Sequence, residues 1–251
     1  MPDADLDPFG PEPWLRLGEL TFRSRLLLGV EQYTDPAVVR DVLDASGADV
    51  FITTYDLERT RSSLLLSDLD REVDLARFAW IGTTSFAHSA NDAVETSRRL
   101  RDSLGLDVIK LDVRDDSNMP DAAATVVAAK ELLNDGFSLL PFILPDPATA
   151  RVLEGMGCSA LRLMASPVAS YRGLVDEAAL RSCIDAVGVP TVVEGGLGST
   201  AHVSRAFEIG ADAVLVNTMV ARAPDPGRMA RAVRHAALAG GFAAGQLDTP
   251  A

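Results

Sequence analysis

Cysteine, positive charge and long apolar runs are scarce in this chain of 251 residues, and each shortage excludes a class of protein. Only Cys158 and Cys183 are cysteines, too few for a disulfide framework or a cysteine metal site and typical of a reducing cytoplasm. The formal net charge of −13 argues against nucleic-acid binding, which requires a basic surface. The apolar runs are far too short to cross a bilayer, and the acidic, proline-rich start lacks the apolar segment of a secretory signal. We therefore expect a cytoplasmic protein with no nucleic-acid and no membrane partner.

Lysine is scarcer still, since Lys110 and Lys130 are the only lysines among 23 basic residues. Lys110 lies in the middle of DVIKLDV (107–113), an apolar run typical of a buried parallel strand. Arginine keeps its proton inside a protein, whereas a buried lysine can lose it. The position of Lys110 therefore indicates either a reactive amine or a buried ion pair.

Short apolar runs alternate along the chain with segments of helical periodicity. After a hairpin expected over 14–22, eight such runs follow: 24–29, 49–55, 78–84, 107–113, 138–144, 160–166, 191–196 and 213–219. Helical patterns include 36–47, 119–136, 147–157 and 199–210, and several of them end in glycine, which is typical of a helix C-terminus. Eight strand–helix units in this length predict an α/β fold, a single (β/α)8 barrel. An open doubly wound sheet is the alternative, but it rarely needs eight consecutive parallel strands.

No linker divides the chain, so we expect one barrel domain over residues 13–240. The flanking segments, 1–12 and 241–251, are expected to be flexible because of their composition. The oligomeric state stays open, and a homo-oligomer is compatible with the sequence.

The active sites of such barrels lie at the carboxyl ends of the strands, where this sequence has its unusual polar residues. Lys110 and Asp112 share one face of the fourth strand with Val108, because side chains alternate along a strand. Glu194 ends the seventh strand before a glycine-rich turn and a helix start. The expected catalytic residues are Lys110, Asp112 and Glu194, and the expected substrate or phosphate ligands are Gly195, Gly196, Gly198, Ser199, Asn217, Thr218, Thr54, Thr84, Ser166 and Arg172. Other polar residues at strand ends are Thr53, Tyr55, Asp56, Thr83 and Ser85.

Each of these features has two interpretations. Lys110 with Asp112 or Glu194 is either a structural ion pair or a Schiff-base lysine, whose desolvated amine attacks a carbonyl while carboxylates move protons. The segment EGGLGST (194–200) is either a plain strand–turn–helix connection or a phosphate cradle of backbone N–H groups at a helix start. The functional interpretation is favoured in both cases, because buried charges are costly unless they are paired or used.

Other reactive residue types point to structural roles. The spacing of His88, His202 and His235 does not match metal ligands, and we expect no metal and no cofactor. The two cysteines are expected in the core rather than as nucleophiles. The arginine-rich stretches 98–102 and 228–235 lie on expected helices as solvated faces.

Four stretches resemble thiazole synthase, the barrel enzyme that builds the thiazole phosphate of thiamin. They are SRLLLG (24–29), VIKLDV (108–113), GFSLLPFILPDPATARVLEGMGC (136–158) and EGGLGSTAHVSRAFEIGADAVLVNTMVARAPDPGRMARAV (194–233), within a similarity over roughly residues 14 to 240. The resemblance implies an imine between Lys110 and a ketose phosphate, and sulfur from the C-terminal thiocarboxylate of a ubiquitin-like carrier protein ending in Gly-Gly. It also implies that Gly196, Gly198, Asn217 and Thr218 hold the phosphate.

The departures from the family pattern concentrate in the loops and the acids. Asp112 stands where the family has Glu, and Glu194 stands where it has Asp. Its Asn-Thr-Ala-Gly turn is replaced by residues 83–86, its Gly-Ser-Gly loop by SPVASYRG (166–173) with Tyr171 and Arg172, and its Gly-Thr-Gly-Lys turn by GVEQ (29–32). The lysine and phosphate elements are kept while the remaining substrate contacts change.

This pattern implies the same opening chemistry on another sugar phosphate. The chain is most similar to a branch of the family that makes 2-thiosugars from hexose phosphates in secondary metabolism such as antibiotic biosynthesis. Glucose 6-phosphate fits, because its aldehyde could condense with Lys110 and proton shifts would create a ketone at C2 for sulfur to attack. Two alternatives stay open: a thiazole synthase acting on 1-deoxyxylulose 5-phosphate, and a non-catalytic barrel that binds a sugar phosphate or a carrier protein.

Overall fold

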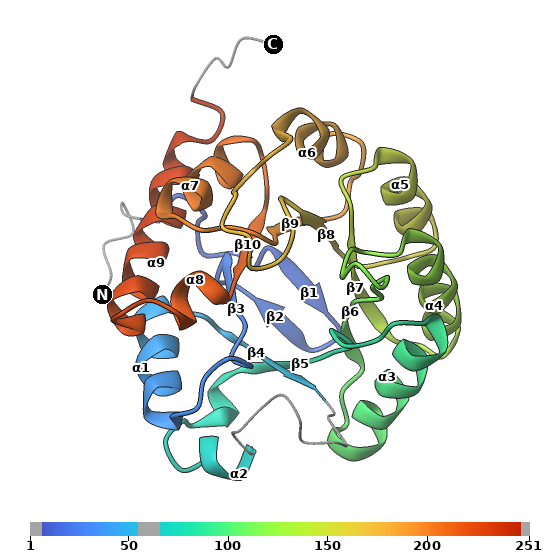
Figure 1. Ribbon diagram of the computed structural model, residues 1–251, viewed down its shortest axis with the longest axis horizontal. Coiled ribbons are helices and arrows are strands. Elements are labelled where there is room, and N and C mark those ends of the chain that lie inside the picture. Colours follow the sequence, from blue (N-terminus) through green and yellow to red (C-terminus); the bar gives the residue numbers. More distant parts are fainter. Residues whose placement is uncertain (1–6, 55–65, 247–251) are drawn as a thin grey trace.

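Eight parallel strands form one sheet in the computed structural model, which describes residues 7–54 and 66–246 (Figure 1). The strands are β3 (Leu26–Leu28), β4 (Val50–Thr54), β5 (Ala79–Thr83), β6 (Val108–Leu111), β7 (Ser138–Ile143), β8 (Leu161–Met164), β9 (Thr191–Glu194) and β10 (Ala213–Val216). Their order in the sheet is β3-β10-β9-β8-β7-β6-β5-β4, and β3 contacts β4, so the sheet closes almost completely. Tyr55 and Asp56, which were expected near the site, lie outside the described residues.

Helices surround the sheet and complete the predicted (β/α)8 barrel (Figure 1). They are α1 (Pro36–Ser46), α2 (Leu66–Leu69), α3 (Ala90–Leu104), α4 (Ala122–Asn134), α5 (Pro147–Gly155), α6 (Glu177–Ile184), α7 (Thr200–Glu208), α8 (Thr218–Ala221) and α9 (Pro226–Ala243). A 3-10 turn, Leu75–Arg77, precedes β5. Within the described ranges no helix is long and apolar enough to span a membrane.

Asp–Pro pairs begin three of these helices, at residues 35–36, 146–147 and 225–226. In each pair the Asp carboxylate accepts a hydrogen bond from a free N–H of the first turn, and Pro supplies a helical φ where no N–H is needed. The helix predicted over 119–136 begins later, at Ala122, because Asp121 is its N-cap and accepts from the N–H of Ala124. The arginine-rich stretches lie on α3 and α9, and Arg98 of α3 pairs with Glu131 and Asp135.

The predicted hairpin consists of β1 (Leu15–Leu17) and β2 (Leu20–Phe22), which pair antiparallel. Figure 1 shows it across the barrel axis. Its buried side chains join the apolar cluster in the barrel interior, which includes Leu15, Leu17, Phe22, Leu27, Val50, Ile52, Ile81, Val108, Leu140, Ala160, Val192, Ala213 and Leu215. Because these apolar side chains fill the interior, polar groups can lie only at the opposite end of the barrel, where the strands have their carboxyl ends.

The strands are shorter than the apolar runs that predicted them. β6 ends at Leu111 and β10 at Val216, so Asp112, Asn217 and Thr218 follow the strands instead of ending them. Asn217 leaves the extended conformation with φ −142° and ψ −79°, and Thr218 begins α8. The chain therefore turns at these positions, which places their side chains at the rim of the barrel.

Candidate active site

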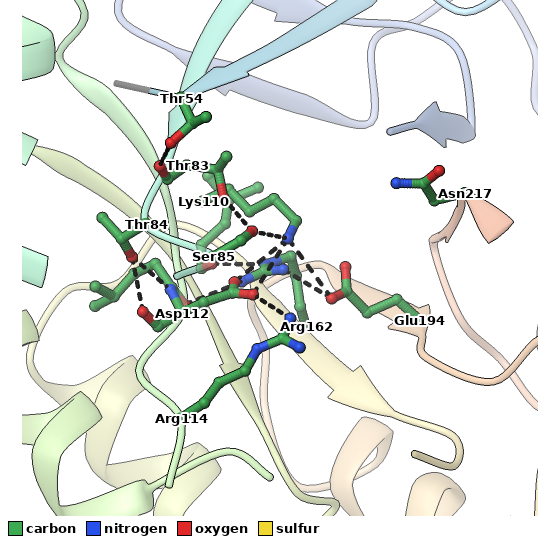
Figure 2. Close-up of polar contacts among 12 residues, drawn as sticks. Thr54, Thr83, Thr84, Ser85, Lys110, Asp112, Arg114, Arg162, Glu194 and Asn217 are labelled. Atoms are coloured by element: carbon green, nitrogen blue, oxygen red, sulfur yellow. Dashed lines mark hydrogen bonds and ion pairs between the residues drawn. The ribbon is translucent and has the colours of Figure 1, made fainter. Parts of the chain in front are cut away.

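A layer of charged side chains lies directly above the apolar interior, at the carboxyl ends of the strands (Figure 2). Lys110 comes from β6, Arg162 from β8 and Glu194 from β9. Two positions earlier in the chain are apolar interior residues: Val108 on β6, Ala160 just before β8 and Val192 on β9. Because side chains alternate along a strand, the charged residues point to the same side as these residues, into the barrel.

Lys110 is buried, with 5% of its surface exposed, whereas Lys130 lies on the exposed face of α4. The Nζ atom of Lys110 is 3.4 Å from both carboxylate oxygens of Asp112 and 3.9 Å from Oε1 of Glu194. It also donates to Oγ of Ser85 at 3.3 Å. The structure thus brings together Lys110, Asp112 and Glu194, the three residues expected to be catalytic.

Arg162 joins the two carboxylates, and the sequence analysis missed it. Its side chain is fully buried, donates from Nη1 to Oε1 of Glu194 at 2.9 Å and pairs through Nη2 with Oδ1 of Asp112. Its other donors reach backbone carbonyls, of Leu140 at 2.8 Å and of Leu111 at 2.9 Å. The signal was present in LRLM (161–164), which has a cation inside a buried strand as DVIKLDV does. A buried guanidinium stays charged, so it compensates two carboxylates that would otherwise be isolated in the barrel.

Asp112 is fixed as an anion. Burial alone would raise the pKa of its carboxyl, but the neighbouring cations Arg162, Lys110 and Arg114 hold that pKa well below the usual range. Nη2 of Arg114 donates to Oδ2 of Asp112 at 2.7 Å. The main chain is fixed too, since Thr84 Oγ1 exchanges two 2.8 Å hydrogen bonds with the N–H and C=O of Asp112. Asp112 therefore serves as a permanent counter-ion at neutral pH.

Glu194 differs from Asp112 because only one of its oxygens is occupied. Oε1 accepts from Arg162, whereas Oε2 is buried and has no hydrogen-bond partner. Glu194 also lines the cavity described below, while Asp112 does not. A buried carboxylate oxygen without a partner is costly, so this atom is suited to accept a proton, or a hydrogen bond from a hydroxyl, of a bound molecule.

A cavity of about 340 Å³ opens above this layer. Six of the residues selected from the sequence line it: Lys110, Glu194, Gly195, Gly196, Asn217 and Thr218. The lining does not include Thr54, Thr84, Ser166, Gly198, Ser199 or Arg172. Thr54 and Thr84 instead bond to the backbone of neighbouring strands, and the Ser199 hydroxyl caps α7. Arg172 is exposed, and the neighbouring Tyr171 lines the cavity in its place.

The glycine-rich turn after β9 packs tightly against the loop after β8. Gly195 and Gly196 have φ of 80° and 62°, and a Cβ on Gly196 would lie 1.9 Å from Oγ of Ser166. Glycine is required there because it adopts positive φ without a clash and leaves room for the serine. The N–H of Gly198 donates to Nδ1 of His202 at 3.1 Å. The Gly198 N–H was expected to belong to a phosphate cradle, but it already donates to His202.

Two further residues that the sequence analysis did not select lie beside the Asn217–Thr218 pair. Glu31 accepts from Nδ2 of Asn217 at 2.7 Å, and Nε2 of Gln32 donates to Oγ1 of Thr218 at 2.9 Å. Both come from the turn after β3, where the sequence departs from the thiazole synthase pattern. Oδ1 of Asn217 is buried without a hydrogen-bond partner, so an acceptor remains free at this end of the cavity.

The other reactive residue types have structural surroundings. Cys158 and Cys183 are buried in the core, as predicted, and burial raises the pKa of their thiols to about 12 and about 11. Nδ1 of His88 bonds to the Arg114 carbonyl at 3.2 Å, and His202 bonds to Gly198. Over residues 7–54 and 66–246, no three His, Cys, Asp or Glu side chains converge as a metal site.

Comparison with solved structures finds the same architecture. A chain of the BexX/CysO complex from Amycolatopsis orientalis is 57% identical, with a TM-score of 0.93, and the match covers 96% of this chain and 99% of that one. 3-Hexulose-6-phosphate synthase from Salmonella typhimurium, at 20% identity and a TM-score of 0.57, covers 85% of this chain and 98% of that one and shares the fold alone.

Comparison of sequences identifies the family. The thiazole synthase of Exiguobacterium sibiricum is 38% identical over 241 residues, which are 93% of each chain. That of Shewanella amazonensis is 36% identical over 223 residues, 87% of this chain and 80% of the relative. The family model for the thiazole biosynthesis protein ThiG matches residues 16–249. The resemblance noted in the sequence is therefore confirmed, and the chain is an enzyme that belongs to the ThiG thiazole synthase family.

Proposed function

We propose that this enzyme forms an imine between Lys110 and the open-chain aldehyde of glucose 6-phosphate, and then replaces the C2 oxygen of the sugar with sulfur. The sulfur comes from the thiocarboxylate of a ubiquitin-like carrier protein that ends in Gly-Gly. The observation that carries the proposal is the Nζ atom of Lys110, buried at a cavity wall between two carboxylates.

The charges around Lys110 favour a nucleophilic amine. The cluster contains three basic groups, Lys110, Arg114 and Arg162, and two carboxylates, Asp112 and Glu194. Both guanidinium groups stay protonated in a protein, so they alone balance the two carboxylates. Each carboxylate therefore keeps a guanidinium partner when the Lys110 amine is consumed in an imine. A neutral amine is what attack on an aldehyde requires.

The two acids take different roles in this proposal. Asp112 accepts hydrogen bonds from two guanidinium groups and stays ionised, so it stabilises the positive iminium that forms on Lys110. Glu194 lines the cavity and its Oε2 has no hydrogen-bond partner, so it removes the proton from C2 of the sugar and returns it at C1. This proton shift converts the imine at C1 into a ketone at C2, and Lys110 remains attached through a C–N single bond.

The remaining steps balance without an oxidant or a reductant. The thiocarboxylate sulfur adds to the C2 carbonyl, the acyl group of the carrier moves from sulfur to the former carbonyl oxygen, and the carrier leaves as a carboxylate. Glu194 then removes a proton from C1 and delivers it to C2 of the thioketone, so that the imine re-forms at C1 and a thiol is left at C2. Water hydrolyses this imine, which replaces the water released at the start and frees the Lys110 amine. One C2 oxygen has been exchanged for one sulfur.

The phosphate is placed at the opposite end of the cavity, where Asn217 would exchange its hydrogen bond to Glu31 for one to the phosphate. Gly195 and Gly196 bring backbone close to the cavity, while Asn217 and Thr218 mark the start of α8. The positive end of the neighbouring longer helix, α7, follows the same glycine turn at Ser199. Phosphates commonly bind in barrels at the loops after the seventh and eighth strands, which are β9 and β10 here.

A protein partner is supported by the solved relative, since BexX was crystallised as a complex with CysO. The high identity to that chain favours a carrier-dependent reaction here as well. A carrier tail would reach the cavity from the carboxyl end of the barrel, where the loops around Ser85, Asn118 and Tyr171 surround the opening.

Mass spectrometry of the intact protein tests the imine. The protein is incubated with glucose 6-phosphate or 1-deoxyxylulose 5-phosphate, reduced with borohydride and weighed. Wild type and Lys130→Ala, which keeps the buried lysine, should gain one hexose phosphate, and Lys110→Ala should gain none. Absence of any Lys110-dependent adduct with a hexose phosphate would sink the proposal.

The second candidate is a thiazole synthase acting on 1-deoxyxylulose 5-phosphate, and the similarity to thiazole synthases favours it. An adduct with only this ketose phosphate, together with rescue of a thiazole auxotroph, would establish that function instead. A non-catalytic barrel would bind ligand equally well after Lys110→Ala and would form no adduct at all.

A further inference from the structure

Backbone strain is concentrated at the cavity. In the described part of the chain, three residues other than glycine have positive φ: Asn118 at 60°, Ala169 at 62° and Tyr171 at 59°. All three line the same cavity as Lys110. For Asn this conformation is tolerated, but for Ala and Tyr it brings Cβ against the main chain and raises the conformational free energy. Such conformations persist only where tertiary contacts enforce them, and they cluster at functional sites.

The loop after β8 is held in this conformation by the glycine-rich turn. The N–H of Gly173 donates to the C=O of Gly196 at 2.9 Å, and the N–H of Ser170 donates to the C=O of Pro167 at 3.0 Å. A Cβ on Gly198 would lie 2.6 Å from Cβ of Tyr171 and 2.7 Å from its Cα. Gly198 thus allows the backbone of Tyr171 to lie directly on the turn. These contacts fix the backbone of residue 171 at positive φ, independently of its side chain. Glycine would therefore be the least strained residue at this position.

The tyrosine side chain extends from this turn toward α8. Its hydroxyl is 3.5 Å from the carbonyl of Thr218, at the limit of a hydrogen bond, and 43% of the residue is exposed. The phenol therefore lies beside Thr218 and lines the same cavity as Gly196 and Asn217, the other residues proposed to hold the phosphate, with its hydroxyl weakly engaged. A strained residue with a nearly free donor at a proposed anion site is explained by a ligand contact.

We propose that Tyr171 is a substrate-positioning residue that covers the phosphate end of the cavity. Its hydroxyl leaves the Thr218 carbonyl and donates to a phosphate oxygen, and its ring excludes water from the Asn217–Thr218 side. This inference rests on the proposed function for the identity of the sugar, but the phosphate contact itself needs no imine.

The test is calorimetric binding of inorganic phosphate and of glucose 6-phosphate to wild type, Tyr171→Phe and Tyr171→Gly. Loss of a hydrogen bond to a charged group should weaken both ligands about ten-fold in each variant. The thermal midpoint of Tyr171→Phe should equal that of wild type, because the lost hydrogen bond is at its distance limit. The control is Tyr33→Phe, whose buried hydroxyl has no partner and does not line this cavity, and which should bind both ligands as wild type does.

If Tyr171→Phe binds inorganic phosphate with wild-type affinity, the inference is overturned. It is also overturned if only the affinity for glucose 6-phosphate falls, because the contact is then with a sugar hydroxyl. A wild-type protein that binds no phosphate would overturn it too. If Tyr171→Gly fails to fold, Tyr171→Phe carries the test. The outcome is separable from the proposed function, because weaker phosphate binding without any Lys110 adduct in wild type supports the Tyr171 contact and rejects the imine.

Discussion

Arg162 donates to Glu194 at 2.9 Å from a side chain that has no exposed surface. The same guanidinium pairs with Asp112, so one buried cation fixes the two carboxylates on either side of Lys110. This bridge holds one oxygen of Glu194 in place and leaves the other without a hydrogen-bond partner, in a residue that lines the cavity. The relationship determines which acid can exchange protons and which stays charged.

Replacing Arg162 with Met should destabilise the fold strongly. The substitution leaves two buried carboxylates with less compensation, which typically costs about 3–5 kcal/mol in the free energy of unfolding. Urea unfolding measures this cost. The control is Arg98→Met, which breaks two half-exposed ion pairs on α3 and should cost about 1 kcal/mol or less. Equal losses in the two variants would contradict the role of the buried bridge.

Acid should destabilise the protein in part through Asp112. Its folded pKa is held well below the ordinary value of 3.8, so its protonation favours the unfolded chain. The stabilisation is therefore fully present above the unfolded pKa and is lost as the pH falls from about 4 toward the folded pKa. Urea unfolding of wild type and Asp112→Asn between pH 7 and pH 3 measures it. The difference between them should be constant near neutrality and should shrink below about pH 4, and a difference independent of pH would contradict the assignment.

Replacing Glu194 with Gln should separate imine formation from proton transfer. The variant keeps Lys110 and should still trap the sugar phosphate, but removal of a general base slows proton transfer about 10²- to 10⁴-fold. Incorporation of deuterium at C2 of glucose 6-phosphate in heavy water, followed by mass spectrometry, reports this step. Glu95→Gln, on the exposed face of α3, is the control and should exchange as wild type does. Wild-type exchange by Glu194→Gln would transfer the role of base to Asp112.

A methyl group at Gly196 should damage the phosphate end of the site. The added Cβ at φ 62° would lie 1.9 Å from Oγ of Ser166 and 3.0 Å from the Pro167 carbonyl. We expect Gly196→Ala to cost about 1–3 kcal/mol of stability and to weaken phosphate binding. Gly155→Ala is the matched control, because no atom lies within 4 Å of its Cβ and the residue ends α5. It should stabilise the protein by about 0.4–1 kcal/mol, and a similar loss in both variants would argue against a specific clash.

The two thiols should take no part in sulfur transfer. Cys158 and Cys183 are buried, and their pKa values are raised to about 12 and about 11, so little reactive thiolate exists near neutrality. Iodoacetamide at pH 8 should leave the native protein unlabelled by intact mass and should label both cysteines in urea. Rapid labelling of the native protein would reopen a route through a cysteine.

The barrel and its lysine could be predicted because their signals are local. Asp35–Pro36 and Gly47 mark the ends of α1 in the sequence as they do in the structure. Lys110 and Asp112 could be placed on one side of β6 from the alternation of a strand. The glycines after Glu194 marked the turn between β9 and α7. Each of these inferences needs only a few neighbouring residues.

Tertiary structure alone determined the partners of these residues. Arg162 on β8 reaches Asp112 across 50 positions, because β8 and β6 flank β7 in the sheet. Asn217 reaches Glu31 across 186 positions, because closure of the sheet brings β10 beside β3. The positive φ of Tyr171 is likewise invisible in the sequence, since contacts with Gly198 and Gly196 impose a conformation that tyrosine itself disfavours. The sequence thus determined which strands carry chemistry, through local patterns of polarity and turn residues. The closed barrel decided which charges meet and which oxygen stays free, because these depend on distances between strands that no local pattern specifies.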